Sequence, residues 1–243
     1  MITIDLSGKN ALITGGTRGI GRAISRTLAQ AGAATAAVYR TDEQTAEASL
    51  HERHAFDLAT HHNYQADVAD ADQIARLVAQ VQADFDGRLD ILVHNAAAQG
   101  GGRIEDFPPD QWRRMLDVNL TAAYLLTRAM LPIMPRGASI VNIASGAGHD
   151  PMAGLAGYAA SKAGLIMFTA DLAQDIGPQG IRANVVSPGG TDTSPDPQQR
   201  PSDANALRRR GVAQDVANVV LFLCSDLASF VTGQALRVNG GAV

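Results

Sequence analysis

The sequence has little cysteine and few aromatic residues. Cys224 is the only cysteine among 243 residues, and aromatic side chains make up 5% of the chain. A lone cysteine excludes an internal disulfide, which is typical of proteins in the reducing cytoplasm, so we expect a cytoplasmic protein. Few aromatics beside 24 glycines favour helices packed closely on a sheet over a β-barrel that stacks its ligand.

An excess of basic residues and long apolar runs are also missing. Lys and Arg number 20 against 24 Asp and Glu, which gives a formal net charge of −4. Nucleic-acid binders carry a Lys and Arg excess for phosphate contacts, so we expect no nucleic-acid partner. No apolar run of about 18 residues is present, and residues 1–6 do not resemble a secretory signal. We therefore expect no membrane partner.

Short apolar runs alternate with longer segments of helical spacing along the chain. This alternation predicts an α/β fold, a doubly wound parallel sheet of the Rossmann type with about seven strands and helices on both faces. The expected strands are residues 10–14, 33–39, 62–66, 89–94, 138–143, 181–186 and 235–238. The expected helices include residues 20–31, 72–85, 110–131 and 155–176. No linker divides the chain, so we expect one domain over residues 1–243.

A glycine-rich loop follows the first expected strand and leads directly into the first helix. Its sequence over residues 14–21 is Thr-Gly-Gly-Thr-Arg-Gly-Ile-Gly. Glycines permit a tight turn and a close approach of the backbone to a phosphate, and a helix N-terminus presents free N–H groups to it. We therefore expect a dinucleotide cofactor to bind this loop. The loop residues assigned to the cofactor are Gly15, Thr17, Arg18, Gly19, Ile20 and Gly21.

The end of the second expected strand indicates which nicotinamide cofactor binds. An acidic residue there binds the ribose hydroxyls of NAD, whereas an arginine accommodates the 2′-phosphate of NADP. This strand ends at Tyr39 without an acid, Arg40 follows it, and Arg18 in the glycine loop adds a second guanidinium. Guanidinium groups bind phosphate through charge-assisted hydrogen bonds. The sequence therefore predicts NADP(H) as the cofactor, with Tyr39 and Arg40 as well as Arg18 among the residues that bind it.

Ser145, Tyr158 and Lys162 form a candidate catalytic group. Tyr158 and Lys162 are four residues apart in a segment of helical spacing, so they share one helix face. A lysine ammonium beside a phenol stabilises the phenolate and lowers the pKa of the phenol toward the range that a general acid or base needs. Ser145 follows the fifth expected strand, and its hydroxyl can hydrogen-bond a substrate carbonyl oxygen. These residues predict proton transfer at a carbonyl oxygen.

With the Thr-Gly-x3-Gly-x-Gly loop, Ser145 and the Tyr-x3-Lys sequence in this order, the chain resembles the short-chain dehydrogenase/reductase family. The likeness extends from about residue 6 to the C-terminus. It implies that Asn119 completes a tetrad with Ser145, Tyr158 and Lys162, by binding a water that links the lysine to solvent. Ala97 departs from the family's Asn-Ala-Gly sequence. The further cofactor contacts that the resemblance implies are Asp67, Val68, Asn95, Ala96, Tyr158, Lys162, Pro188, Gly189, Thr191 and Thr193.

Within the family the chain is most similar to 3-oxoacyl-acyl-carrier-protein reductases. This likeness implies an NADPH-dependent carbonyl reductase or alcohol dehydrogenase, whose ketone can be tethered to a carrier protein. It also implies a homotetramer packed through residues 110–131 and 155–176. A small ketone, a polyol, a sugar or a polyketide intermediate remains an alternative substrate. An NADP-binding sensor or scaffold without turnover remains an alternative function, because fold alone does not fix function.

Two other features are a group of histidines and a polar segment near the C-terminus. His51, His54, His61 and His62 lie near one another in the sequence without clustered acids or cysteines, so we expect no metal site. Residues 192–211 are polar and rich in proline. We expect them to form a mobile loop that orders over the substrate.

Overall fold

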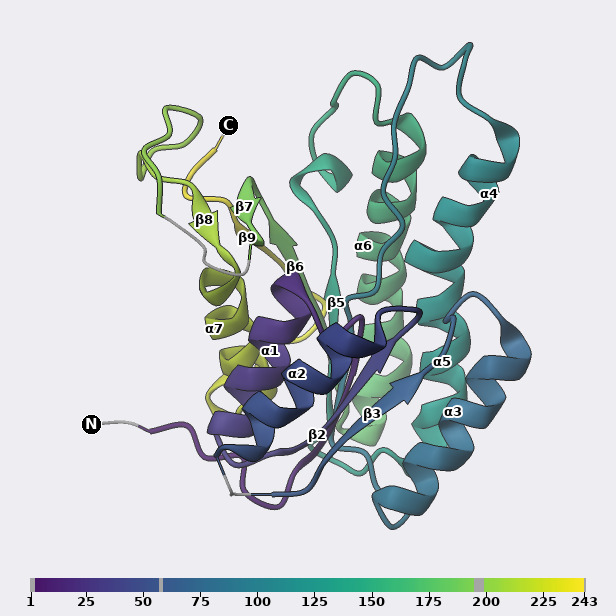
Figure 1. Ribbon diagram of the computed structural model, residues 1–243, viewed down its shortest axis with the longest axis vertical. Coiled ribbons are helices and arrows are strands. Elements are labelled where there is room, and N and C mark those ends of the chain that lie inside the picture. The colour runs from purple at the N-terminus through teal and green to yellow at the C-terminus, as the bar shows by residue number, and fades with distance from the viewer. Residues whose placement is uncertain (1–2, 57–58, 195–198, 243) are drawn as a thin grey trace.

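The computed structural model describes residues 3–56, 59–194 and 199–242. Seven parallel strands form its central sheet, in the order β3-β2-β1-β4-β5-β6-β9 (Figure 1). The strands are β1 (Asn10–Thr14), β2 (Ala34–Tyr39), β3 (His61–Gln65), β4 (Ile91–His94), β5 (Ser139–Ile143), β6 (Arg182–Pro188) and β9 (Ala235–Val238). Each expected strand is present, with ends that differ by at most two residues from the prediction. The predicted doubly wound α/β fold is confirmed.

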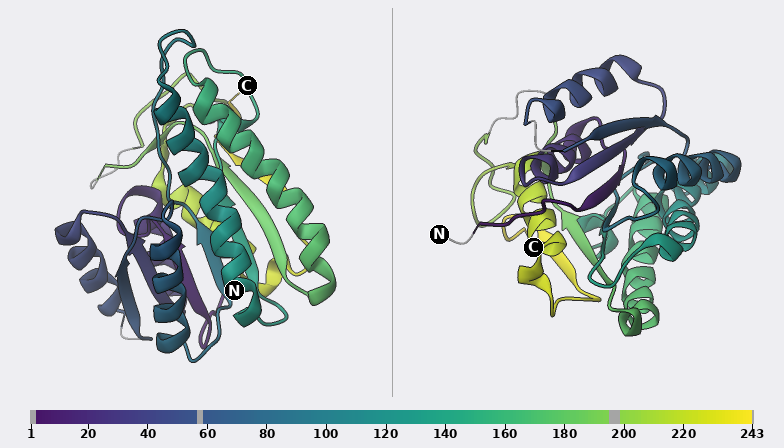
Figure 2. Two further views of the ribbon diagram at one scale, coloured as in Figure 1. Left: turned by 90° about the vertical axis from the view of Figure 1, so that its right-hand side faces the viewer. Right: turned by 90° about the horizontal axis from the view of Figure 1, so that it is seen from below.

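Helices cover both faces of the sheet. One face carries α1 (Gly19–Gln30), α2 (Glu43–His54) and α7 (Ala213–Cys224), and the other carries α3 (Ala71–Asp84), α4 (Pro109–Leu116), α5 (Ala122–Met130) and α6 (Ala156–Ile176). In the left view of Figure 2, α4 and α5 follow one another along one line, and α6 lies alongside them. Two further short strands, β7 (Thr191–Asp192) and β8 (Gly211–Val212), pair with each other outside the main sheet.

The core consists of two apolar layers, one on each side of the sheet. Along β1, Ala11 and Ile13 pack with α1 and α7, whereas Leu12 packs with α3 and α5. Side chains alternate between the faces of a strand, and in a parallel sheet both faces are buried. This is why central strands such as β4 and β5 are mostly apolar, whereas the edge strand β3 is not. Cys224 is buried in the layer beneath α7, as expected for a small core residue.

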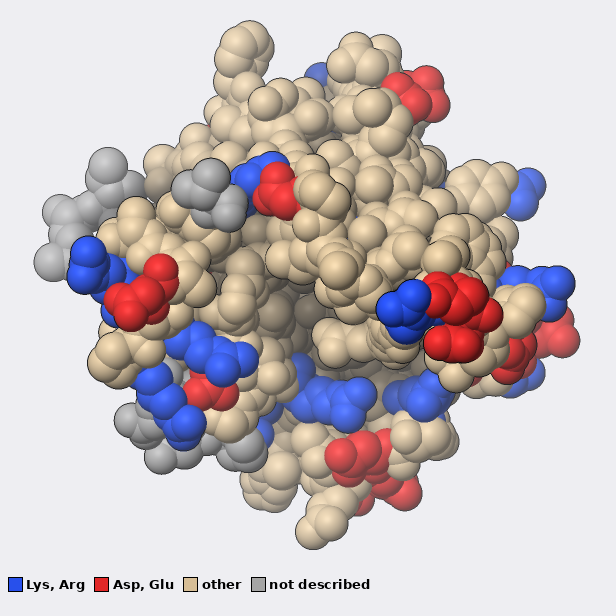
Figure 3. Space-filling model, turned by 90° about the horizontal axis from the view of Figure 1, so that it is seen from above, with Lys and Arg blue, Asp and Glu red and all other residues tan. Residues whose placement is uncertain are grey.

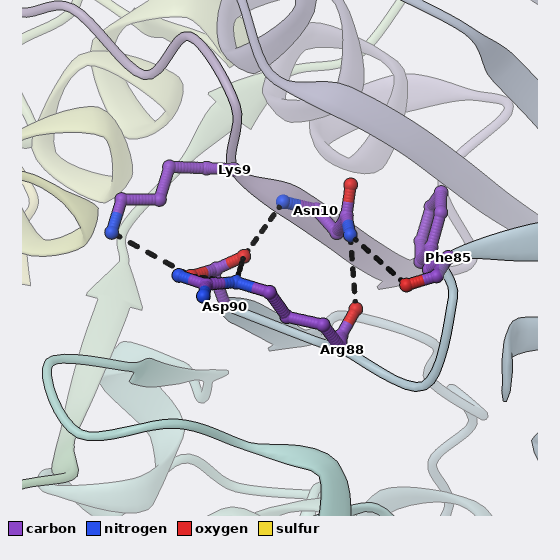
Figure 4. Close-up of polar contacts among 5 residues, drawn as sticks. All are labelled: Lys9, Asn10, Phe85, Arg88 and Asp90. Atoms are coloured by element: carbon purple, nitrogen blue, oxygen red, sulfur yellow. Dashed lines mark hydrogen bonds and ion pairs between the residues drawn. The ribbon is translucent and has the colours of Figure 1, made fainter.

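A polar cluster joins the amino ends of β1 and β4 (Figure 4). The Asp90 side chain is 2% exposed, accepts a hydrogen bond from the Asn10 backbone at 3.1 Å and forms an ion pair with Arg88 at 2.7 Å. Lys9 lies 3.5 Å from the same carboxylate. The Asn10 side chain donates to the carbonyl oxygen of Arg88 at 3.0 Å. These contacts hold the end of the sheet that lies away from the ligand-binding edge.

The expected helix over residues 110–131 is present, but it is not a regular α-helix along its whole length. A π-helical segment, Asp117–Thr121, separates α4 from α5. This segment contains Asn119, whose side chain is buried and hydrogen-bonded to Ala98 and Ser161 rather than pointing to solvent. Single π turns inside helices are frequently found at functional sites.

The segment over residues 192–211 is described except for residues 195–198, so Pro195 and Pro197 lie outside the described residues. The rest is attached to the body by backbone hydrogen bonds. Leu207 donates to Gly240 at 3.0 Å, and Gly211 donates to Gly190 at 3.1 Å. Within the described ranges, no helix is both long and apolar enough to cross a bilayer.

Candidate active site

The glycine loop between β1 and α1 is so tight that an added side chain would clash with neighbouring atoms or strain the backbone. A Cβ added at Gly21 would lie 2.0 Å from the carbonyl oxygen of Gly15. Gly15 itself has φ +61°, and a Cβ there would lie 3.0 Å from the Cα of Ala96. No side chain caps the first N–H groups of α1. The loop is therefore a glycine-lined cradle facing an uncapped helix N-terminus, an arrangement suited to phosphate.

Thr14 and Asn95 tie this loop to the segment after β4. The Asn95 side chain donates to the carbonyl oxygens of Thr14 and Gly15 at 3.0 and 2.9 Å. The Thr14 hydroxyl in turn accepts hydrogen bonds from the backbone N–H groups of Asn95 and Ala96 at 3.0 and 3.1 Å. Strand order reverses between β1 and β4, which is where ligands bind in open parallel sheets.

Two exposed arginines lie near this loop. Arg18 immediately precedes α1, and Arg40 follows β2. Neither guanidinium forms an ion pair with any part of the chain that the structure describes. Seen from above in Figure 3, basic side chains gather along one rim of a hollow in the surface. Both groups are available to an anionic ligand.

Asp67, after β3, is held in place by Arg114 of α4. The Arg114 guanidinium lies 2.7 Å from the Asp67 carboxylate, which also accepts the backbone N–H of Ala69 at 3.0 Å. Burial raises the pKa of Asp67, but these hydrogen bonds outweigh burial and leave the pKa below its ordinary value. Sequence reasoning missed Arg114. In the sequence it is only one of two successive arginines on an expected helix, and nothing there links it to Asp67.

Tyr158 and Lys162 lie on one face of α6, as predicted. Lys162 is 2% exposed, and its ammonium donates to the carbonyl oxygen of Ile143 at 2.8 Å. The same nitrogen lies over the Tyr158 ring, 5.8 Å from its centroid. Burial lowers the pKa of Lys162 to about 8. The lysine can therefore gain and lose a proton close to neutral pH.

The expected lowering of the Tyr158 pKa is not what the structure shows. Burial raises the pKa of Tyr158, and a hydrogen bond with the Ser145 side chain opposes this rise only in part. The reason is geometric, because the Lys162 ammonium bonds to Ile143 and lies over the ring. Tyr158 thus stays protonated and is placed to donate its proton.

Asn119 joins three segments rather than contacting Lys162 through its side chain. Its amide oxygen accepts the N–H of Ala98 at 2.8 Å, and its amide nitrogen donates to the carbonyl of Ala98 and the hydroxyl of Ser161 at 3.0 and 2.9 Å. Ser161 donates to the carbonyl oxygen of Tyr158 at 2.7 Å. A cavity of about 10 Å³, the size of one water, lies between Asn119 and Lys162.

The segment after β6 forms the remaining wall of the site. Gly189 packs against Asn239, where an added Cβ would lie 2.7 Å from the Asn239 Cβ. The Thr191 hydroxyl donates to the carbonyl oxygen of Gly189 at 3.0 Å. Thr193 lies against the glycine loop, 3.4 Å from where a Cβ of Gly19 would be. The other predicted cofactor residues follow the carboxyl ends of the strands at the same edge or end one of them: Thr17, Ile20, Tyr39, Val68, Ala96 and Pro188.

The structure does not bring the four histidines into a metal site. In the described residues, no group of three or more His, Cys, Asp or Glu side chains is placed to hold a metal ion. His61 is buried and lies 3.0 Å from the Thr35 hydroxyl, and burial lowers its pKa to about 4. His61 is thus a neutral core residue at pH 7.

Comparison with known proteins gives matches over nearly the whole chain. A family model described as Enoyl-(Acyl carrier protein) reductase matches residues 15–243. The 3-oxoacyl-[acyl-carrier-protein] reductase FabG of Aquifex aeolicus (strain VF5) is 37% identical over 246 residues, which cover 98% of both chains.

Solved structures give the same result. A short chain dehydrogenase from Burkholderia cenocepacia J2315, in complex with NADP, has a TM-score of 0.90 at 38% identity and covers 97% of this chain and 98% of its own. A blue fluorescent protein from a metagenomic library, in complex with NADPH, has a TM-score of 0.91 at 36% identity and covers 98% of both chains.

These matches agree with the resemblance expected from the glycine loop, Ser145 and the Tyr-x3-Lys sequence. The family model, the full-length relative and the solved structure each match nearly the whole chain. The chain belongs to the short-chain dehydrogenase/reductase family.

Proposed function

We propose that this protein is an NADP(H)-dependent ketoreductase that transfers hydride between the nicotinamide and a ketone or secondary alcohol. The observation that carries the proposal is the grouping of Ser145, Tyr158 and Lys162 at the carboxyl end of β5. The protonated phenol can act as a general acid, the hydroxyl can hydrogen-bond a carbonyl oxygen, and the charged lysine can stabilise the phenolate that proton transfer leaves.

The residues at the carboxyl edge of the sheet fit NADP(H). The glycine cradle and the uncapped start of α1 suit the pyrophosphate. The exposed guanidinium groups of Arg18 and Arg40 suit the 2′-phosphate, and Asp67 faces the adenine side of the site in this assignment. The relatives solved with NADP and NADPH support the same choice.

The mechanism follows from what each side chain can do. When bound, NADPH supplies the hydride for the carbonyl carbon. Tyr158, kept protonated by burial, donates its proton to the carbonyl oxygen, and the Ser145 hydroxyl donates a hydrogen bond to that oxygen. Lys162 stabilises the resulting phenolate by its charge, and its own proton is exchangeable at a pH of about 8.

For the substrate we favour a 3-oxoacyl thioester, which can be tethered to a carrier protein. The likeness to the Aquifex reductase supports this class. The description of the family model names reduction of an enoyl group instead. Enoyl reductases of related fold use a longer Tyr-to-Lys spacing than the three intervening residues between Tyr158 and Lys162, which favours the ketone.

We also propose a homotetramer in the cytoplasm. Tyr124 on α5 and Met167 on α6 are 48% and 62% exposed, although both are large and apolar. Exposed apolar patches on adjacent helices are typical of subunit contacts. The lone, buried Cys224 suits a reducing compartment. Within residues 1–243 we regard the chain as one domain built on a single main sheet.

The experiment is a comparison of initial rates of NADPH and NADH oxidation with 3-oxoacyl thioesters, enoyl thioesters, small ketones, and oxidised polyols and sugars. We expect turnover with NADPH and the 3-oxoacyl thioesters, and none with the enoyl thioesters. A preference for enoyl thioesters would overturn the ketone assignment. Tight NADPH binding without turnover on any substrate would favour the sensor or scaffold.

A further inference from the structure

The turn that follows Ser145 lies directly on the backbone of α6. Residues 146–148 form a single 3-10 turn, in which Gly148 donates to the carbonyl oxygen of Ser145 at 3.0 Å. A Cβ added at Gly148 would lie 2.9 Å from the carbonyl carbon of Lys162. No side chain therefore separates this turn from the helix of Tyr158 and Lys162. The position of the turn fixes how far Ser145 lies from that helix.

The two residues that directly follow the turn, His149 and Asp150, are bound by two strands of the sheet. The Nε2 atom of His149 lies 2.9 Å from the Ser187 hydroxyl on β6. The Asp150 carboxylate accepts two hydrogen bonds from the Arg237 guanidinium on β9, at 2.9 and 3.0 Å. Ser187 and Arg237 are themselves register partners in the sheet. We call the His149–Ser187 and Asp150–Arg237 contacts the double tether.

The double tether orients the turn more than it stabilises the fold. Asp150 and Arg237 have side chains that are 45% and 39% exposed, and an exposed ion pair contributes little to stability. A two-bond contact between a guanidinium and a carboxylate nevertheless fixes their relative orientation. Ser187, in contrast, is fully buried, so the second contact anchors the turn to the interior of the sheet.

His149 is uncharged at neutral pH in this setting. Burial lowers its pKa, and Arg237 lowers it further against the opposing effect of Asp150. Ser187 faces it from β6. The nearby lysine of α6, Lys162, directs its ammonium to the carbonyl oxygen of Ile143. The imidazole therefore holds the turn through its contact with the Ser187 hydroxyl and not through a charge.

We propose that His149 and Asp150 are positioning residues, which hold the turn so that the Ser145 hydroxyl stays aligned with the Tyr158 phenol. This inference rests on the proposed role of Ser145 in carbonyl reduction. Neither His149 nor Asp150 needs to contact the substrate. They affect the reaction only through the position of Ser145. Their substitution should therefore lower kcat only in an enzyme that has Ser145.

The test is a double-mutant cycle between the double tether and Ser145. Ser187→Ala and Arg237→Met each remove one contact, and kcat, KM and the Kd of NADPH are measured with a 3-oxoacyl thioester. We expect kcat to fall about tenfold in each, since small displacements of a reacting group are costly. The Kd of NADPH should stay within about twofold. In the Ser145→Ala background, the same two changes should lower the residual kcat by less than about twofold.

Two controls separate alignment from folding. Arg237→Lys keeps the charge and should recover part of the lost kcat. Arg88→Met breaks an Arg–Asp pair at the opposite end of the sheet, so it should lower the Tm without changing kcat.

If Ser145→Ala is slow while Ser187→Ala and Arg237→Met keep the wild-type kcat, the inference about the double tether is overturned and the proposed role of Ser145 stands. The inference is also overturned if these changes slow the Ser145→Ala enzyme by the same factor as the wild type. A wild-type kcat in Ser145→Ala would overturn the proposed role of Ser145 and, with it, the inference.

Discussion

The Lys162 ammonium donates to the carbonyl oxygen of Ile143 at 2.8 Å and so joins the helix of Tyr158 to the last residue of β5. Lys162 forms no ion pair with a carboxylate in the described ranges of the chain. A buried ammonium without an anion loses its proton more easily than one in water. Its burial therefore makes Lys162 a titrating group, and not a fixed charge, over the Tyr158 ring.

The first prediction concerns the pH dependence of reduction. The pKa of Lys162 is about 8 and that of Tyr158 is raised above its ordinary 10. Above about pH 8 the lysine loses its proton while the phenol keeps its own, so kcat should fall about tenfold per pH unit. Measurement of kcat at saturating NADPH across this range checks it. Lys162→Arg, which keeps its charge, should remove the decline in whatever activity remains. A flat profile to pH 9.5 would contradict the assignment of Lys162.

The second prediction concerns Gly21. An added Cβ would lie 2.0 Å from the carbonyl oxygen of Gly15, which no side-chain rearrangement can relieve, so Gly21→Ala must displace the loop. We expect the Kd of NADPH to rise at least about 100-fold, as fits the loss of several phosphate hydrogen bonds. Titration of NADPH fluorescence measures it. Gly177→Ala is the matched control, since a Cβ there meets nothing within 4 Å.

The third prediction concerns cofactor choice. Arg18 and Arg40 are exposed and free of ion pairs among the described residues. The double variant Arg18→Ala/Arg40→Ala should raise the KM for NADPH about 100-fold, because a charge-assisted contact contributes about 1.5–3 kcal/mol. The KM for NADH should change less than about threefold. Equal losses for both cofactors would show that the arginines do not bind the 2′-phosphate.

The fourth prediction concerns stability in acid. His61 has a folded pKa of about 4 against an ordinary 6.5, so the unfolded chain takes up a proton in that window while the folded chain does not. Stability is complete above pH 6.5 and falls as the pH drops toward 4, by at most about 1.4 kcal/mol per pH unit for one group. Burial also lowers the pKa of His94, to about 3, so His94 adds to the same loss of folding stability as the pH falls.

Urea unfolding of the wild type and His61→Gln at pH 7 and 5 checks this prediction. The variant should lose less stability between the two pH values, because one of the two buried groups is gone. His51→Gln, at an exposed position of α2, serves as the control. An unchanged slope in His61→Gln would contradict the assignment.

The strands and the main site residues were predictable because their signals are local. A strand such as β5 is buried along its whole length, so apolar character marks it in the sequence. The π-helical segment around Asn119 was not predictable, since the hydrogen bonds of the Asn119 side chain are with Ala98 and Ser161, 21 and 42 residues away. The pKa of Tyr158 was predicted in the wrong direction for a similar reason. Residue spacing places the lysine on the same face but does not reveal how deeply the phenol is buried.

The contacts of Arg114 and His149 were also not predictable from the sequence, because their partners are distant along the chain. Their partners, Asp67 and Ser187, are 47 and 38 residues away. Neither arginine nor histidine at these positions belongs to a short motif. Only the folded chain shows which polar residue each of them meets.

The π-helical segment Asp117–Thr121 makes the length of this region as important as its composition. Each residue of a regular helix advances it by about 100°. A π turn holds one residue more than an α turn, so deletion of one residue from this segment would close it to a regular α-helix and leave α4 and α5 nearly in phase. Arg114 would then still face Asp67, but the wide turn that holds Asn119 would be lost. Natural or engineered sequences that align here with a one-residue gap should therefore keep the Arg114–Asp67 contact and lose the contacts of Asn119 with Ala98 and Ser161.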